Sequence, residues 1–399
     1  MNNPERRDRL RNAMRENHLD LIICALPKNV LLLSGYWPVV GTGVAVAFSE
    51  GRISLVVPED EAELAKRGWA NDIWTFTSGS LSELTTAAKA IQTPLRKLTA
   101  TFSAEPMRVG FEAQETSEPA SYAAIHLYSG TMRTVLEETL SIRTLISADE
   151  VLADLSSHKT DFEIEQIRNS CRIAEQAFRR GFEQIESGTS EVQTAARFRE
   201  SLSTSLVEYP ELSRTDGFAW CMSGPNSALA SGAYARSRAK RIETGDLLLV
   251  HLNSYADGYW TDVTRTYSMG KIDERKIEMY EAVFAARAAA LRAIYPGAKG
   301  AEVDAAARDV LESRGFGPQF KHSTGHGVGF SAINANAKPR LHPKSEDPME
   351  AGMVFNIEPA IYFEGYGGIR HCDMVTITKQ GMDLLTPFQS NVEELVVNN

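Results

Sequence analysis

The sequence predicts two domains of mixed helix and sheet, a smaller α/β domain at 1–155 followed by a larger α+β domain at 156–399. The chain has 399 residues, which is longer than a single hydrophobic core usually organises. Apolar runs alternate with helical patterns until a polar stretch at 147–160, which is typical of a linker. Beyond it, two pairs of helical segments lie between pairs of strands. The α+β architecture follows from these observations.

The first domain is expected to open with a helix over 4–17, where apolar residues share one face. The run at 19–25 predicts a buried strand, and N-V-L-L-L-S-G-Y at 29–36 predicts a second apolar element closed by Gly35. Residues 41–58 predict a hairpin. There is no G-x-G-x-x-G motif at a strand-to-helix junction and no P-loop, so a nucleotide-binding role is not expected.

The second domain is expected to begin with a long helix. Thr160 and Glu163 form the capping box T-x-x-E at its start, and Gly188 is expected to end it. Further apolar and helical patterns predict helices over 190–206, 273–294 and 301–314, and strands over 217–223 and in the C-terminal tail.

Composition excludes several classes of function. The net charge is -10 and the pI about 5.4, which disfavours binding to nucleic acid phosphates. The N-terminus has no apolar segment typical of a secretory signal, and no apolar run approaches the length of a membrane span. Four cysteines without a C-x-x-C motif indicate reduced thiols. We therefore predict a cytoplasmic protein that binds neither membrane nor nucleic acid.

The most informative stretch runs from Leu247 to Thr266. It is an apolar strand, a turn at Asp257-Gly258 and a return strand. Side chains alternate between the faces of a strand, so a two-residue loop places His251 and Asp262 on the same face and close together. The alternative is that His251 is an ordinary core histidine with its hydrogen bonds satisfied.

Three later residues extend this polar cluster. His326 lies between glycines in T-G-H-G-V-G, Glu358 lies in N-I-E-P-A, and Cys372 lies in G-I-R-H-C-D-M-V. Each has a simpler explanation alone: a histidine in a glycine-rich turn, a glutamate at a strand end, and a buried cysteine acting as a small apolar residue. Their order and spacing together are far more specific.

This pattern resembles the "pita-bread" family of aminopeptidase P, prolidase, methionine aminopeptidase and creatinase. The matched features are N-V-L-L-L-S-G-Y, D-G-Y-x-x-D-V-T-R-T, G-H-G-V-G, I-E-P and G-I-R-x-x-D-M-V, which together span most of the chain. The resemblance implies a creatinase-type N-terminal domain before a pita-bread catalytic domain. It also implies a homodimer.

Metal-dependent members of this family hold two divalent ions with Asp, Asp, His, Glu and Glu. Carried over by position, the resemblance places these ligands at His251, Asp262, His326, Glu358 and Cys372. The first and last therefore depart from the pattern. Losing two carboxylates should remove one ion, and we expect no metal cofactor, with a single ion at Asp262, His326 and Glu358 as the alternative.

Other positions of the peptidase pattern also differ. The upstream histidine of the peptidases falls at Ser231, and the His-Glu pair that follows G-H-G-V-G falls near Ile333 and Asn334. The peptidase pattern is thus interrupted at several catalytic positions.

Creatinase, which the resemblance includes, acts on a guanidinium substrate without metal. By the same logic Asp262 and Glu358 would hold a substrate that brings its own delocalised cation. We therefore expect hydrolysis of a cyclic amidine C–N bond, in a small zwitterion such as ectoine or hydroxyectoine. Ectoine would give N-acetyl-2,4-diaminobutyrate, which a deacetylase would consume in compatible-solute catabolism.

Roles for the site residues follow from this expectation. Glu358, alone or with His326, would activate water or attack the amidine carbon, and His251 or His326 would protonate the leaving nitrogen. Cys372 is a second candidate nucleophile. Candidate substrate-binding residues are Arg340 and Arg370 for the carboxylate, and Trp37 and Phe330 for the apolar side.

Three rival functions remain open at this point. They are a metal-dependent Xaa-Pro dipeptidase or aminopeptidase, a creatinase-type amidinohydrolase, and a non-catalytic binding protein. The surviving Asp262, His326 and Glu358 disfavour the last.

Overall fold

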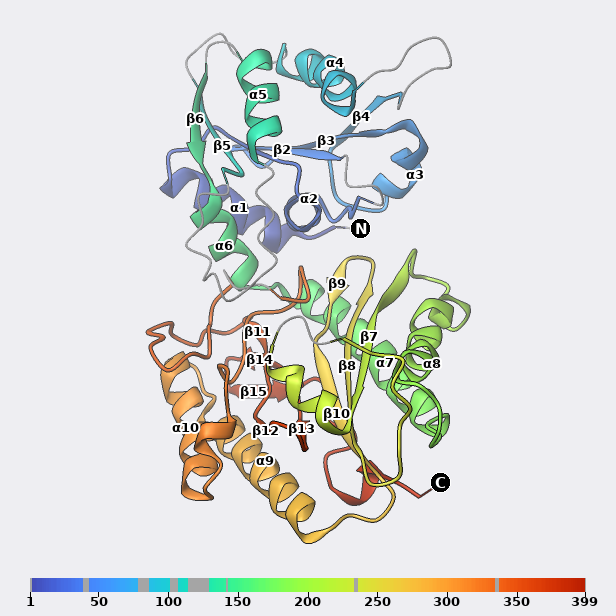
Figure 1. The fold of residues 1–399 in the computed structure, drawn as a ribbon. Coiled ribbons are helices and arrows are strands. Elements are labelled where there is room, and N and C mark those ends of the chain that lie inside the picture. Colours follow the sequence, from blue (N-terminus) through green and yellow to red (C-terminus); the bar gives the residue numbers. More distant parts are fainter. Residues whose placement is uncertain are drawn as a thin grey trace. The chain divides into compact units, whose positions relative to one another are not determined.

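The structure is a computed structural model that divides into two compact units, Met1–Ser156 and Ser157–Asn399. Figure 1 shows the helices and strands of both units. The residues described are 2–38, 43–77, 86–100, 107–113, 129–140, 143–232, 236–333 and 337–398.

The first unit is built on a six-stranded sheet of order β4-β3-β2-β1-β5-β6. β1 pairs antiparallel with β2 and parallel with β5, so the sheet is mixed. Its strands are β1 (Leu21–Cys24), β2 (Val44–Phe48), β3 (Ile53–Pro58), β4 (Asp72–Phe76), β5 (Met107–Phe111) and β6 (Arg143–Ser147). Its helices are α1 (Pro4–Glu16), α2 (Pro27–Ser34), α3 (Ala62–Ala65), α4 (Ala87–Thr99), α5 (Ser129–Thr139) and α6 (Asp149–Ser157).

Four expectations for this unit can be compared directly with the structure. The helix over 4–17 and the hairpin of β2 and β3 are confirmed. Gly35 caps α2 with φ 70°, a left-handed conformation that glycine adopts without strain. The division between the two units falls within the linker expected over 147–160, after Ser156, and α6 occupies most of that stretch. Leu152 and Leu155 are buried there at helical spacing, which the polar composition concealed.

In its described residues, the second unit combines three sheets with four long helices. The first sheet has the order β16-β10-β8-β7, with β9 paired to β8. Its strands are β7 (Thr215–Ser223), β8 (Leu247–Ala256), β9 (Tyr259–Trp260), β10 (Val263–Met269) and β16 (Val396–Val397). A three-stranded sheet contains β11 (Val354–Ile357), β14 (Asp373–Thr378) and β15 (Gly381–Leu384), and a pair contains β12 (Ala360–Phe363) and β13 (Gly367–Arg370).

The helices cover these sheets in two pairs (Figure 1). α8 packs against β7 and α7 against β8, whereas α9 packs against β12 and β13 and α10 against α9. Their bounds are α7 (Asp161–Glu183), α8 (Glu191–Thr204), α9 (Glu274–Ala293) and α10 (Gly300–Ser313). Among the described residues, no helix is both long and apolar enough to span a membrane.

The predicted start of α7 is confirmed and its predicted end is wrong. Thr160 and Glu163 form the capping box, with each side chain bonded to the backbone of the other residue. The helix ends at Glu183, before Gly188, because Gln184 already has non-helical angles and caps the last turn. Gly188 instead turns the chain with φ 86° on the way to α8.

A fully buried arginine joins β10 to the C-terminal segment. Arg265 donates hydrogen bonds to the carbonyls of Cys372 (2.8 Å), Thr386 (3.0 Å) and Phe388 (2.8 Å). It also pairs with Asp373 at 2.8 Å, where both side chains are completely buried. Arg265 therefore fixes Cys372, the residue just before β14, against the strand that follows Asp262.

The buried side chain next to Cys372 makes stability depend on pH. Burial, with the Arg265 guanidinium second, lowers the pKa of His371 to about 4. An unfolded histidine has a pKa of about 6.5. The unfolded chain therefore takes up this proton first, and stability is lost as pH falls from about 6.5 to about 4, by up to about 3 kcal/mol.

We expect His371→Gln to remove this component. The free energy of unfolding in urea, measured at pH 7 and at pH 5, should fall less on acidification in the variant than in the parent chain. His342→Gln is the control, because His342 is exposed. Equal acid sensitivity of the parent chain and His371→Gln would contradict the prediction.

Candidate active site

The five residues that the sequence singled out lie together in the second unit. The Nδ1 atom of His251 is 3.5 Å from Oδ1 of Asp262. The Nε2 atom of His326 is 3.5 Å from Oδ2 of Asp262 and 3.9 Å from Oε1 of Glu358. The Sγ atom of Cys372 lies 3.2 Å from the carbonyl oxygen of Asp262 and 3.6 Å from its Oδ1. Their catalytic roles remain predictions.

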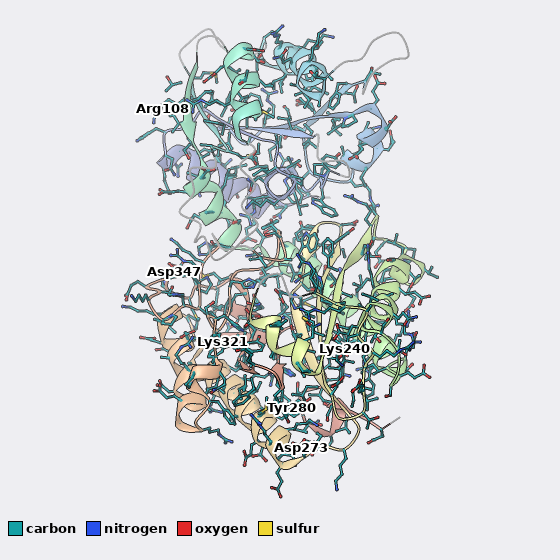
Figure 2. The ribbon with its side chains drawn as sticks, viewed as in Figure 1. Arg108, Lys240, Asp273, Tyr280, Lys321 and Asp347 are labelled. Carbon is teal, nitrogen blue, oxygen red and sulfur yellow. The ribbon has the colours of Figure 1, made fainter. Side chains whose placement is uncertain are left out.

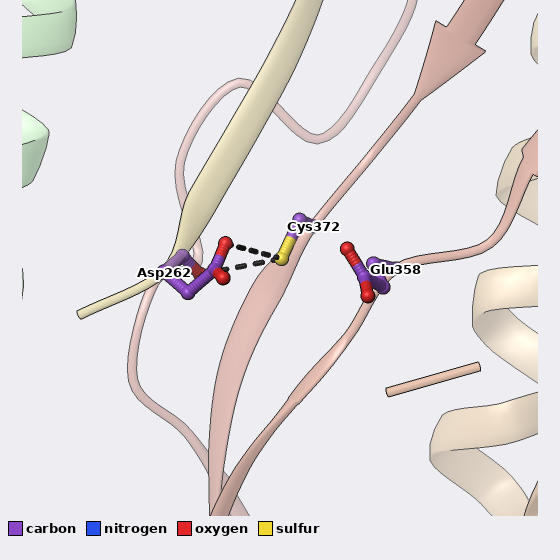
Figure 3. A group of neighbouring side chains, drawn as sticks. All are labelled: Asp262, Glu358 and Cys372. Atoms are coloured by element: carbon purple, nitrogen blue, oxygen red, sulfur yellow. Dashed lines mark hydrogen bonds between the residues drawn. The ribbon is translucent and has the colours of Figure 1, made fainter. Parts of the chain in front are cut away.

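Figure 3 shows Cys372 between the two acids. One ligand atom from each of Asp262, Glu358 and Cys372 lies within 4.8 Å of the other two. The thiol therefore lies between two carboxylates. Unlike a carboxylate, it supplies neither a negative charge nor oxygen atoms there.

The hairpin turn at Asp257-Gly258 is confirmed and positions the first half of the site. Ala256 pairs with Tyr259 around this two-residue turn. The register then places Thr264 opposite His251, with Nδ1 of the histidine 2.9 Å from the threonine hydroxyl. Thr264 also pairs through its backbone with Cys372, at 3.3 Å and 3.1 Å. This bridge brings the start of β14 to the hairpin.

The glycine-rich segment holds His326 against the edge of β11. The backbone N–H of His326 donates to Oδ1 of Asn356 at 2.7 Å. A Cβ on Gly325 would lie 2.0 Å from the carbonyl oxygen of Asn356, so only glycine allows this approach. The Nδ1 atom of His326 donates to the Gly327 carbonyl at 3.1 Å. Nε2 is therefore the nitrogen that gains or loses a proton when His326 titrates, and it faces both acids.

The surroundings shift the two histidines in opposite directions. Burial lowers the pKa of His251, and the attraction of Asp262 does not compensate for it. Burial also disfavours the charged form of His326, but the hydrogen bond to Asp262 and the charge of Glu358 outweigh it and raise its pKa. His326 is thus the better proton donor near neutral pH, and His251 is a neutral hydrogen-bonding group.

The remaining groups have clear charge states. Although burial opposes it, the neighbouring His251 and His326 hold the pKa of Asp262 well below its usual range, so Asp262 is a carboxylate. Burial raises the pKa of the Cys372 thiol, and both acids raise it further. Cys372 is therefore a thiol, which is a poor nucleophile.

Arg370 contributes a buried cation to the site. Its Nη1 atom is 3.8 Å from Oε2 of Glu358 and 3.3 Å from the carbonyl of Ala230. Its Nε atom donates to the hydroxyl of Thr264 at 3.1 Å. The guanidinium is therefore held beside Glu358 at the base of the site.

The other candidate substrate-binding residues lie in different surroundings. Arg340 pairs with Asp347 at 2.7 Å and 2.8 Å, a contact near the start of α10, where Figure 2 labels Asp347. Phe330 is buried, with its ring centroid 5.8 Å from that of Tyr259. Trp37 is half-buried in the first unit. Their contact with substrate remains a prediction.

The positions that break the peptidase pattern are partly described. Ser231 ends the 3-10 helix Gly224–Ser231. Ile333 is 43% exposed, and Asn334 lies outside the described residues.

Three site residues were not predicted from the sequence. Thr264 could have been found, because it lies two positions after Asp262 and so shares its face. Asn356 lies two positions before Glu358, and its amide Nδ2 is 3.2 Å from Nε2 of His326 and 3.5 Å from the Cys372 sulfur. Trp220 lies opposite His251, with ring centroids 5.4 Å apart, and is visible only once β7 is paired with β8.

The donor set does not fit a two-ion centre. Such a centre needs carboxylates that bridge two cations, and here His251 and Cys372 offer an imidazole and a protonated thiol. The Arg370 guanidinium adds a positive charge 3.8 Å from Glu358. The donors of Asp262, Glu358 and Cys372 are close enough for one ion.

Comparison with known proteins identifies the class. Residues 165–379 match the model of metallopeptidase family M24, and residues 6–155 match the creatinase/prolidase N-terminal domain. The chain belongs to metallopeptidase family M24. This confirms the predicted fold, a creatinase-type N-terminal domain followed by a pita-bread domain.

The relatives extend along almost the whole chain. The Xaa-Pro dipeptidase of Pyrococcus furiosus is 32% identical over 382 residues, covering 96% of this chain and 97% of the relative. A crystal structure of prolidase from Pyrococcus horikoshii OT3 superposes with a TM-score of 0.76 at 27% identity, covering 97% and 99% of the two chains. A structure of prolidase from Pyrococcus furiosus gives a TM-score of 0.73 at 30% identity, covering 95% and 99%.

These relatives define the chain as a hydrolase of the M24 family, and they bear on the metal expectation. The family description is that of metallopeptidases, which stands against the expectation of a metal-free enzyme. The replacement of two metal-binding carboxylates by His251 and Cys372 supports that expectation. The conflict concerns the five side chains of the site and leaves the fold unaffected.

Proposed function

We propose that this chain is a hydrolase that opens the cyclic amidine of ectoine to N-acetyl-2,4-diaminobutyrate. The observation that carries the proposal is the pair of carboxylates, Asp262 and Glu358, with a neutral thiol between them. An amidinium carries one delocalised positive charge and two N–H edges, which suit two carboxylates.

Charge balance supports a small zwitterion in preference to two metal ions. Two carboxylates beside the Arg370 guanidinium leave about one negative charge while His326 is neutral. An amidinium between the two acids and a substrate carboxylate beside Arg370 would each meet an opposite charge and leave that net charge unchanged, whereas two divalent ions would leave a large excess of positive charge in a buried site. The substrate carboxylate would lie toward Arg370, the described arginine that is nearest to Glu358.

The proposed reaction uses Glu358 as base and His326 as acid. Glu358 takes a proton from water as the water oxygen bonds to the amidine carbon, and a tetrahedral carbon forms. The ring C–N bond then breaks, and the proton that Glu358 took from water passes through Nε2 of the neutral His326 to the departing nitrogen. The products are an amide and an amine, so no oxidant or other reactant is needed. His251 stays neutral and orients Asp262.

The second candidate is an Xaa-Pro dipeptidase. The observation that favours it is the similarity to the Xaa-Pro dipeptidase of Pyrococcus furiosus over 96% of this chain. In that case one ion would be held by Asp262, Glu358 and either His326 or Cys372. The names of the relatives support this candidate, and the side chains at 251 and 372 support the first.

One sample can separate the two candidates. Purified protein is analysed for metal content and then incubated with ectoine, hydroxyectoine, creatine and Xaa-Pro dipeptides, with products identified by mass spectrometry. We expect ectoine and hydroxyectoine to be opened at a rate that a chelator leaves unchanged. Dipeptide cleavage that a chelator abolishes, with bound metal in stoichiometric amount, would establish the second candidate instead.

A further inference from the structure

The side chain of Asn356 lies between His326 and Cys372 and is completely buried. The backbone N–H of His326 donates to Oδ1 of Asn356 at 2.7 Å. The amide nitrogen Nδ2 lies 3.2 Å from Nε2 of His326 and 3.5 Å from the Cys372 sulfur. The backbone N–H of Asn356 also donates to the carbonyl of His326 at 3.0 Å. One residue of β11 therefore contacts both the backbone and the ring of His326.

The backbone contact fixes which end of the amide faces the ring. An asparagine amide can be turned over without a change of shape, and this exchanges a donor for an acceptor. A backbone N–H can only donate, so the amide atom that meets the N–H of His326 is the oxygen. The nitrogen Nδ2, which carries two hydrogens, is then the atom that faces Nε2. Asn356 therefore presents a hydrogen-bond donor to the imidazole.

The two nitrogens of the His326 ring thus meet partners of opposite polarity. Nδ1 lies 3.1 Å from the carbonyl of Gly327, which can only accept a hydrogen bond. Nε2 meets the donor of Asn356 at 3.2 Å. A neutral imidazole has one N–H and one lone pair. These two partners therefore favour the hydrogen on Nδ1 and the lone pair on Nε2.

The two acids of the site favour the opposite tautomer. A hydrogen on Nε2 would point toward Asp262, at 3.5 Å, and Glu358, at 3.9 Å. The same hydrogen would meet the hydrogens of Asn356, and the lone pair left on Nδ1 would face the carbonyl of Gly327. The contacts with the acids exceed the usual N–H···O distance of about 2.7–3.2 Å. The shorter contacts with Gly327 and Asn356 therefore decide the tautomer.

We propose that Asn356 is a positioning residue that keeps the neutral ring of His326 in the tautomer with a lone pair on Nε2. This role rests on the proposed function for the reaction that the tautomer serves. In that reaction the proton that Glu358 took from water bonds to Nε2, while the hydrogen on Nδ1 stays in place. The imidazolium then gives the Nε2 hydrogen to the departing nitrogen and returns to its starting tautomer. A ring with its hydrogen already on Nε2 has no lone pair there and cannot accept this proton.

The tautomer can be observed without substrate. The histidine rings of the full chain are labelled with nitrogen-15, and nuclear magnetic resonance distinguishes a ring nitrogen that carries hydrogen from one with a lone pair. Spectra are recorded at about pH 9.5, well above the ordinary histidine pKa of about 6.5. The signals lost in His326→Gln assign the ring. We expect hydrogen on Nδ1 and a lone pair on Nε2, and a ring with hydrogen on Nε2 would overturn the proposal.

Asn356→Asp reverses the polarity of this contact with little change of shape. One carboxylate oxygen can still accept the backbone N–H of His326, while the other faces Nε2 as an acceptor. We expect hydrogen on Nε2 in this variant and a fall in kcat for ectoine of about 10²-fold, with KM changed much less. Asn12→Asp is the matched control, because Asn12 is exposed on α1. The same chemical change there should leave the His326 signals and the rates as they are.

An asparagine that only supports the fold would leave the tautomer of His326 unchanged in Asn356→Asp. An unchanged tautomer or an unchanged kcat in that variant would therefore contradict the proposal, and circular dichroism checks that the fold is kept. If Asn356→Asp does not fold, the spectrum of the parent chain still decides. If Nε2 carries the lone pair and ectoine is not opened, the proposed function fails and the assignment of the tautomer to Asn356 stands.

Discussion

Glu358→Gln is expected to lower kcat for ectoine by about 10²- to 10⁴-fold. An amide of the same shape cannot take a proton from water, so the step that forms the C–O bond loses its base. The neighbouring His326 and Arg370 lie 3.9 Å and 3.8 Å from the carboxylate and still have an oxygen to contact, so the fold should be unchanged. Product formation followed by mass spectrometry measures the rate, and circular dichroism checks the fold.

Glu364→Gln provides a matched control. Glu364 is exposed in the turn that joins β12 to β13, a few residues from Glu358. The same chemical change there should leave kcat and KM as they are. Turnover by Glu358→Gln at the rate of the parent chain would refute the role of Glu358 as base.

Arg265→Leu is expected to lower the free energy of unfolding by about 3–5 kcal/mol. The substitution leaves the buried Asp373 with less positive charge beside it, and it removes the donors for the carbonyls of Thr386 and Phe388. Arg287 still contacts Asp373 but reaches neither carbonyl in the described hydrogen bonds. Urea denaturation monitored by fluorescence measures the change.

Arg179→Leu is the comparison for this measurement. Arg179 pairs with Glu175 one turn away on α7, and its side chain is 68% exposed. An exposed pair of this kind contributes at most about 1 kcal/mol. Equal small effects of the two substitutions would show that the Arg265 network does not stabilise the second unit.

Local patterns sufficed to predict the hairpin and its pair of polar residues. The turn at Asp257-Gly258 fixes which residues of β8 and β10 face each other, and alternation then places His251 beside Asp262. The glycines around His326 also signalled a close backbone approach, which the contact with Asn356 explains. In these places neighbours in the sequence determine neighbours in space.

Contacts between distant strands could not be predicted in the same way. Trp220 reaches His251 only because β7 pairs with β8, across a loop of more than twenty residues. The partners of Arg265 in and after β14 lie more than a hundred residues away, and they depend on where β14 and the C-terminal segment pack. Charge states were also beyond the sequence, because burial and neighbouring acids decide that His326 and His251 differ.

The four cysteines give the folded chain a set of built-in reporters of local opening. All four are buried, and burial raises the pKa of each thiol. A thiol reagent therefore reacts with each cysteine only after the surrounding element opens. Cys24 in β1 reports on the first unit, whereas Cys171 in α7, Cys221 in β7 and Cys372 report on the second. The order in which they become labelled ranks the cooperative units of the protein without any engineered probe.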